Sequence, residues 1–241
     1  MIGKGDWEMG DAQRCFELLQ AGDFDGLRWL LDEEPGCAEA RDANGISLLM
    51  QLLYRGRRDL AATVAARKKA LDIFEAASLG RMERLKELAS DRSAVTDRSA
   101  GTDRSGINSR SGDGFTALHF AGFFGQGEAA RVLIDAGAEV DAVASNPMQV
   151  MPLHSAASAR NLEVARHLLE HGAPANARQQ GGWVPLHAAA QNGDRAMVEL
   201  LLRHGADATL ANDAGKTPAA VAREKGHEEV AQLLDGTGVT S

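Results

Sequence analysis

The side chains most suited to catalysis or metal binding are those of the seven histidines, because imidazole can bind a metal or transfer a proton near neutral pH. Three of them, His119, His154 and His187, are spaced 35 and 33 residues apart, and each follows a leucine. Protein zinc sites place histidine, cysteine and carboxylate ligands at short spacings along the chain. No histidine in this sequence has such a set of neighbours, so we predict no metal site.

Sequence motifs for catalysis are also absent. The chain contains no G-x-S-x-G, H-E-x-x-H, G-x-x-x-x-G-K-[ST] or C-x-x-C pattern, each of which would supply a nucleophile, a metal site, a phosphate loop or a redox pair. Its two cysteines, Cys15 and Cys37, are too few for a disulfide framework. Cys15 falls within an apolar helical pattern, which favours buried thiols over a disulfide. We therefore expect no cofactor and no enzymatic activity.

The charge and hydropathy of the sequence argue against nucleic acid and membranes as partners. Lys and Arg number 26 against 34 acidic residues, with a net charge of -8, so no overall positive field attracts nucleic acid. No apolar run reaches the length of a signal-peptide core or a membrane span, and we expect a cytoplasmic protein that binds no membrane. The basic clusters Arg55 to Arg58 and Arg67 to Lys69 are interpreted as solvated helix faces, with an acidic partner as the alternative.

The histidines belong to a recurring four-residue motif, which appears as Thr116–His119, Met151–His154, Val184–His187 and Thr217–Ala220. The third residues of these motifs are 35, 33 and 33 positions apart. A turn marker follows each of them seven residues later, in the order Gly125, Arg160, Gly193 and Gly226. One period therefore organises the second half of the chain.

This period and motif resemble the ankyrin repeat, a 33-residue hairpin, helix, turn and helix unit with the signature T-P-L-H-x-A. The residues that carry the resemblance are Thr116, Leu118, His119, Gly125, Leu153, His154, Leu186, His187, Gly193, Thr217 and Gly226. The resemblance implies that the signature histidines bond to the neighbouring hairpin. It also implies an all-α solenoid with short β-hairpin fingers, and the lean toward Ala and Arg favours a bacterial source.

The same register extends toward the N-terminus through the markers Gly22, Gly56 and Gly80. Eight residues after each of the seven markers stands an apolar residue, namely Leu30, Val64, Leu88, Leu133, Leu168, Leu201 and Leu234, as expected for a buried helical stripe. We predict a single solenoid over residues 1–241 with about seven repeats: 10–41, 42–70, 71–110, 111–144, 145–177, 178–210 and 211–241.

Two irregularities interrupt this register. Residues 65–72 contain no glycine or proline, so we expect a short helix-to-helix connection in place of the hairpin between the second and third repeats. Residues 91–106 repeat the hexapeptide beginning Asp-Arg-Ser, and we expect a long mobile loop there, either an inert insertion or a functional one.

Individual positions also depart from the signature. Arg160 replaces a turn glycine, which costs about 1 kcal/mol in a left-handed conformation, and Asn161 is expected to take over part of that role. Thr at the start of a first helix is expected to cap its amides. Met151 and Val184 lack that cap but keep a proline at the first helical position.

Candidate partner-binding residues follow from the surface that ankyrin proteins present, which is the hairpin tips and the outer face of the first helix. The aromatic residues at such positions are Tyr54, Phe115, Phe123, Phe124 and Trp183, and exposed aromatic side chains commonly anchor interfaces. Met148 and Val150 lie on a finger two residues longer than its neighbours. The alternative is that Phe123 or Phe124 packs locally.

The predicted function is therefore protein binding by a monomeric interaction module or scaffold. A regulatory subunit or inhibitor of an enzyme, or a bacterial effector acting on host proteins, is the alternative, because one fold hosts many functions.

Overall fold

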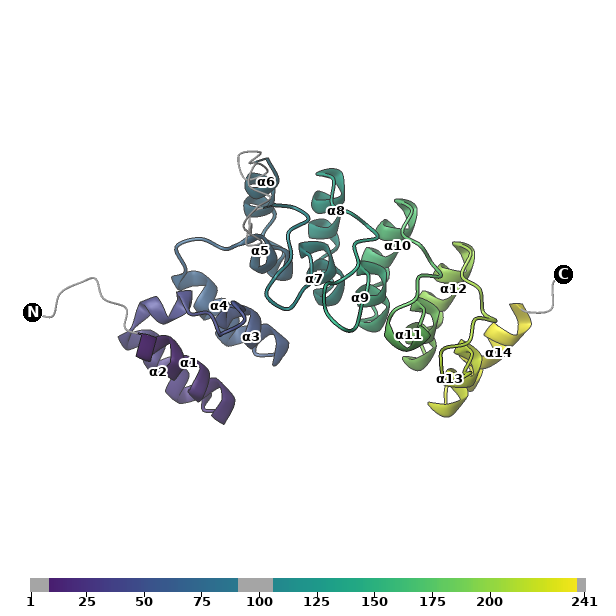
Figure 1. Cartoon of the computed structure of the whole chain (residues 1–241), viewed down its shortest axis with the longest axis horizontal. Coiled ribbons are helices and arrows are strands. Elements are labelled where there is room, and N and C mark those ends of the chain that lie inside the picture. Colours follow the sequence, from purple (N-terminus) through teal and green to yellow (C-terminus); the bar gives the residue numbers. More distant parts are fainter. Residues whose placement is uncertain (1–8, 91–105, 238–241) are drawn as a thin grey trace, which may run out of the picture.

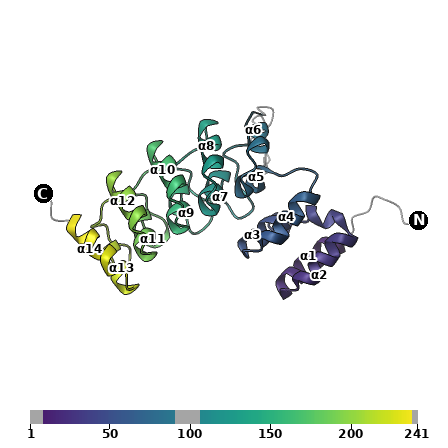
Figure 2. The same cartoon turned by 180° about the vertical axis from the view of Figure 1, so that it is seen from behind.

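The computed structural model describes residues 9–90 and 106–237, and within these ranges the chain forms fourteen α-helices. Consecutive helices pack side by side as seven pairs, which follow one another in a single curved row (Figure 1). The same order is seen from behind in Figure 2. The prediction of an all-α solenoid is confirmed.

The first helices of the pairs are α1 (Met9–Ala21), α3 (Leu48–Tyr54), α5 (Ile73–Leu79), α7 (Ala117–Phe124), α9 (Pro152–Ser158), α11 (Pro185–Gln191) and α13 (Pro218–Glu224). The second helices are α2 (Phe24–Glu33), α4 (Arg58–Arg67), α6 (Met82–Ser90), α8 (Gly127–Asp135), α10 (Leu162–Glu170), α12 (Arg195–Arg203) and α14 (Glu228–Thr237). Two 3-10 helices, η1 (Pro35–Glu39) and η3 (Gln180–Gly182), lie in the connections.

The core is the predicted apolar stripe of the second helices together with the leucines of the first helices. Of the seven stripe residues, six are buried, and Leu88 is partly buried against the same core. Leu118, Leu153 and Leu186 of the signature are buried with at most 1% of their surface exposed. Burying each leucine stabilises the folded state by about 1.5–3 kcal/mol. Because a unit of a repeat array packs only against the units beside it, every pair is stabilised mainly by its neighbours in the row. Cys15 and Cys37 are both buried.

The turn between α9 and α10 carries the expected strain. Arg160 has a φ of 62°, the left-handed value that the marker glycines adopt, such as 71° at Gly125. The expectation that Asn161 would share this role is wrong, because its φ is -91°. Its side-chain amide instead donates to the carbonyl oxygens of Gly122 and Phe123 at 2.6 and 3.2 Å, which ties α10 to the end of α7.

Helix capping by the signature threonine occurs at one of two positions. The Thr217 hydroxyl accepts a hydrogen bond from the Ala220 amide at 3.3 Å. The predicted cap at Thr116 is wrong, because its hydroxyl lies 2.8 Å from Nδ1 of His119 instead of an amide. Met151 and Val184 make no side-chain cap, as expected.

The fingers between the pairs are tight loops, and the bridge from Arg41 to Ser47 is the single isolated β-bridge of the described residues. From the fourth pair onward, each finger bonds to the next through its backbone. The amides of Ser145, Gln180 and Asp213 donate to the carbonyls of Gly114, Met148 and Gly181 at 2.9–3.0 Å. These bonds join successive fingers along the row.

The connection from α4 to α5 has no finger, as predicted, and consists of the five residues 68–72. The packing of the turn glycines also changes along the row. A Cβ atom on Gly80 or Gly125 would lie 2.5 Å from the side chain of Gln126 or Asn161, the residues before the second helices of the next pairs, whereas one on Gly22 or Gly56 would meet nothing within 4 Å. We call residues 9–67 the N-terminal stack and residues 73–90 and 106–237 the C-terminal stack; Figure 1 shows them offset at this point.

The predicted loop at residues 91–106 lies, except for Gly106, outside the described residues. Within the described ranges, the helices are too short or too polar for any of them to cross a lipid bilayer.

Candidate functional site

A solvent-open apolar groove lies where the end of α3 meets α7. It has a volume of about 190 Å³ and is lined by Tyr54, Phe115, His119, Phe120, Phe123 and Ser155. Tyr54 is the last residue of α3, whereas the phenylalanines belong to α7 and to the finger before it. The groove therefore takes its walls from both stacks.

The aromatic rings of the groove form one contiguous cluster. Tyr54 lies 6.3 Å from Phe120 and 6.4 Å from Phe124 between ring centroids, and the second pair is stacked. Phe115 approaches Phe120 edge-on at 5.8 Å, and Phe123 meets Phe124 edge-on at 5.1 Å. These separations are within the range in which aromatic rings attract one another, so the rings pack together as one cluster.

The exposure of these rings divides them into floor and rim. Phe120 is buried, and it also packs edge-on against Phe74 of α5 at 6.0 Å. Phe123 is 49% exposed and Tyr54 is 39% exposed, so both are available to a partner. Phe115 and Phe124 are partly buried against the core, which means that local packing, the alternative considered for Phe124, accounts for part of its surface.

A polar contact holds Tyr54 in place. Its hydroxyl donates a hydrogen bond to Asp113 in the finger before α7, and the same carboxylate accepts from the Ser111 hydroxyl at 2.5 Å. Burial and the hydrogen bond to Asp113 raise the pKa of Tyr54 above its usual value. The tyrosine therefore stays neutral and keeps donating at physiological pH.

The signature histidines have the structural role that the resemblance implied. Nε2 of His119, His154 and His187 lies 2.9–3.0 Å from the carbonyl oxygens of Val150, Ala177 and Lys216 in the following fingers. Nδ1 accepts from the backbone amide three residues earlier at 3.1–3.2 Å. Because Nδ1 accepts, Nε2 carries the proton and each ring is neutral.

Four predicted binding residues lie outside the lining of the groove. Phe124 stacks against Tyr54 at its edge, and the other three lie on the neighbouring fingers. Trp183 is partly buried, with its ring 5.3 Å from that of His187. Met148 is 48% exposed on its finger, and Val150 is partly buried. The structure therefore gathers Tyr54, Phe115, Phe123 and Phe124 but leaves Trp183, Met148 and Val150 on the neighbouring fingers.

Phe120 was missed by the sequence reasoning, although it forms the floor of the groove. It precedes Phe123 and Phe124 by three and four residues, the spacing at which side chains meet on one helix face. That spacing is the signal that could have found it. Among the described residues, no three His, Cys, Asp or Glu side chains come together in a way that could hold a metal ion.

The stacked helix pairs and their open groove define the class of protein as an α-helical repeat protein with a surface suited to binding. The family model described as ankyrin repeats (3 copies) matches residues 16–179 and 153–239. Because these matches cover most of the sequence, the chain belongs to the ankyrin-repeat family. No curated protein sequence matches it. Ankyrin repeats generally mediate protein–protein interactions.

Proposed function

We propose that this protein is a non-enzymatic, cytoplasmic, monomeric interaction module that binds a protein partner through the aromatic groove. The observation that supports this proposal is the exposure of Phe123 and Tyr54 within a contiguous aromatic cluster. Aromatic residues make up only 5% of the chain. Concentrating exposed rings at one place leaves apolar surface in water, which a partner can bury.

The size of the groove favours a side chain of a partner as its occupant. Pockets for small molecules or cofactors typically have volumes of about 300–1,000 Å³, and the groove has about 190 Å³. Its lining residues are mainly aromatic, with Ser155 and the neutral His119 as the polar members. An apolar residue of a partner protein suits this space better than a charged ligand.

The fingers beside the groove extend the proposed interface. Met148 is exposed, and we propose that Met148, Val150 and Trp183 contact the partner outside the groove. We also propose that each helix pair is one repeat, with the seven boundaries predicted from the sequence. A scaffold, an enzyme inhibitor and an effector acting on host proteins would all use such a surface.

The test compares Phe123→Ala with Trp29→Ala. Both residues are exposed aromatics, at 49% and 55%, but Trp29 lies on α2, away from the groove. Each variant and the wild type would be immobilised and used to capture proteins from a lysate, followed by quantitative mass spectrometry. We expect a partner that Trp29→Ala retains and Phe123→Ala loses, with affinity weakened by roughly 1–4 kcal/mol, the range of interface anchors.

Thermal midpoints of both variants should stay close to that of the wild type, because neither side chain is buried. A partner held equally well by wild type and Phe123→Ala would move the interface away from the groove. The next variants would then be Met148→Ala and Trp183→Ala.

A further inference from the structure

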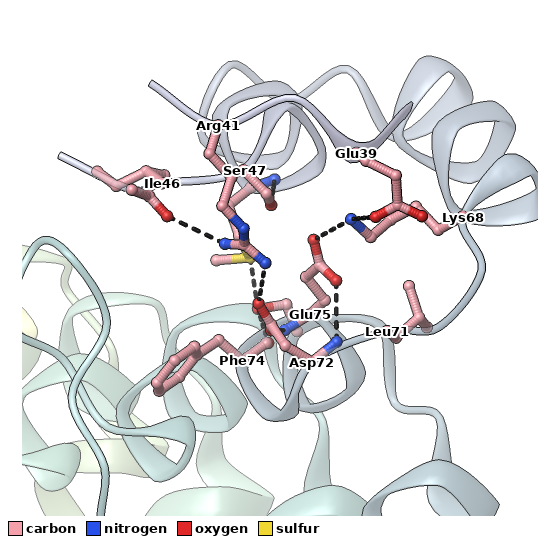
Figure 3. Close-up of polar contacts among 12 residues, drawn as sticks. Glu39, Arg41, Ile46, Ser47, Lys68, Leu71, Asp72, Phe74 and Glu75 are labelled. Carbon is pink, nitrogen blue, oxygen red and sulfur yellow. Dashed lines mark hydrogen bonds and ion pairs between the residues drawn. The ribbon is translucent and has the colours of Figure 1, made fainter. Parts of the chain in front are cut away.

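Charged residues cluster where the N-terminal stack meets α5, as Figure 3 shows. Arg41, in the finger before α3, donates to Asp72 at 2.7 Å. Lys68, which follows α4, lies 3.0 Å from Glu39 and 3.3 Å from Glu75 of α5. We call these five residues, Glu39, Arg41, Lys68, Asp72 and Glu75, the clasp.

The clasp is buried where it crosses the junction. The side chain of Glu75 is fully buried and that of Lys68 is 2% exposed. Burial, followed by the neighbouring Asp72, raises the pKa of Glu75, while Lys68 opposes this shift. The ion pairs Arg41–Asp72 and Lys68–Glu75 connect the N-terminal stack and the residue after it to the start of α5. Breaking a buried pair is costly, because the remaining charge is left without a partner.

The start of α5 fixes the orientation of the acidic half of the clasp. The Asp72 carboxylate accepts from the Glu75 amide at 2.9 Å, and the Glu75 carboxylate accepts from the Asp72 amide at 3.0 Å. This reciprocal capping box orders the first turn of the helix. The acidic side chains of the clasp are therefore held in place by the first turn of α5.

The fingers make a second contact across the junction. Because the finger between α4 and α5 is missing, the finger before α7 reaches the finger before α3, and a Cβ atom on Gly112 would lie 1.8 Å from the carbonyl oxygen of Asn44. The hydrogen bond from Tyr54 to Asp113 links the end of α3, beside the groove, to the finger before α7. The clasp, the fingers and one wall of the groove thus lie along one boundary.

We propose that this junction is a hinge that regulates the aromatic groove. With the clasp closed, Tyr54 completes the groove beside Phe120 and Phe124; with the clasp open, Tyr54 moves away with the N-terminal stack and the groove loses that wall. This inference rests on the proposed function of the groove. A partner that binds the complete groove then favours the closed junction, because a ligand shifts a conformational equilibrium toward the state it binds better.

Tyr54 is the only tyrosine of the chain, so 3-fluorotyrosine incorporated into the full-length protein gives one ¹⁹F resonance at the junction. The test variant is Arg41→Ala, which removes the Arg41–Asp72 ion pair of the clasp. The matched control is Arg28→Ala, which removes an ion pair of 3.2 Å to Asp59 within the N-terminal stack. A soluble gadolinium chelate added to each sample measures how exposed the fluorine is to solvent.

We expect Arg41→Ala to move the resonance toward that of the urea-unfolded chain and to increase its relaxation by gadolinium. The equilibrium constant for opening should rise about tenfold from that of a minor state, which is typically populated at roughly 0.1–10%. Arg28→Ala should resemble the wild type. An Arg41→Ala sample with the wild-type resonance and relaxation would overturn the proposal.

If Arg41→Ala loses helical circular dichroism, Asp72→Asn decides the question by the same criterion. Asn keeps the helix cap but removes the charge that Arg41 pairs with. The fluorine measurement involves no partner, so it separates the two proposals. If the groove binds nothing, the wild type and Phe123→Ala capture the same proteins; if the junction is rigid, Arg41→Ala leaves the fluorine signal unchanged.

Discussion

Each signature histidine ties its own helix pair to the finger of the next pair. Burial lowers the pKa of His119 and of His154 to about 4, and it also lowers the pKa of His187. Both ring nitrogens need the neutral form of the imidazole, because Nδ1 accepts one hydrogen bond while Nε2 donates another. Protonation of a ring would remove the acceptor and place a charge inside the stack.

This arrangement predicts that acid destabilises the protein through its histidines. Between pH 6.5 and about 4 the unfolded chain binds protons at His119 and His154 that the folded chain does not bind, so stability falls as the pH falls through this window. The loss is at most about 3 kcal/mol for each of these two residues. Urea unfolding at a series of pH values measures it.

His154→Gln provides the comparison. We expect it to be less stable at pH 7 by about 1–3 kcal/mol, because buried hydrogen-bonding groups lose a partner, but to lose less further stability between pH 6.5 and 4. The matched control is His171→Ala, at an exposed position, which should keep the acid dependence of the wild type. Parallel curves for His154→Gln and the wild type would contradict this explanation.

At the scale of the elements, the turn from α9 to α10 carries a residue that strains it. Arg160 holds a left-handed backbone, and its contact of 3.5 Å with Asp194 is made by a side chain that is 61% exposed. The Asp194 side chain is only 12% exposed, but an ion pair whose other partner is largely in solvent is worth about 0–1 kcal/mol, so it does not outweigh the backbone cost. The turn persists because the helices on both sides are packed.

Arg160→Gly is therefore expected to stabilise the protein by about 1 kcal/mol, since glycine adopts the left-handed conformation without a steric penalty. Thermal unfolding checks this gain. The control is Arg166→Gly, at an exposed position inside α10, where glycine should cost about 1 kcal/mol because it disfavours helix. A lower midpoint for Arg160→Gly would mean that the contact with Asp194 outweighs the strain.

At the scale of the whole molecule, two stacks meet at one irregular junction. Backbone bonds between fingers join the fourth to seventh pairs, whereas the second pair is joined to the third by the clasp and to the fourth by the contact of Gly112 with Asn44. The offset of the N-terminal stack in Figures 1 and 2 follows from the absent finger.

Gly112→Ala should loosen this junction, because its new methyl group would collide with the backbone oxygen of Asn44. We expect a loss of about 1–3 kcal/mol, as for other overpacked contacts, measured by thermal unfolding. Gly236→Ala is the matched control: nothing lies within 4 Å of its Cβ position, and alanine favours helix, so its midpoint should stay the same or rise. Equal midpoints for the two variants would show that the fingers separate freely.

Hydrogen exchange should also differ along the row. Amides of residues 150–205 should exchange more slowly than those of residues 10–70, because inner pairs of a repeat array are packed on both sides and their fingers are bonded to one another. Exchange measured by mass spectrometry resolves the two regions. Slower exchange in residues 10–70 would place the most stable part of the molecule in the N-terminal stack.

Much of the fold could be predicted from local patterns in the sequence. The apolar stripe from Leu30 to Leu234 and the turn markers determine where helices form and end, because helical periodicity and left-handed turns depend on residues close together in the chain. The same locality made the strain at Arg160 and the missing finger at residues 68–72 predictable. The histidine contacts followed from the family resemblance.

The groove was decided by the tertiary structure alone. Tyr54 and Phe120 belong to pairs that are not consecutive, and they meet because the connection before α5 lacks a finger. Nor did the register distinguish Phe123, which projects into solvent, from Trp183, which turns toward His187. Side-chain direction and the approach of distant elements depend on packing across the whole stack, so a repeating pattern in the sequence predicts which positions can face a partner but not which of them meet.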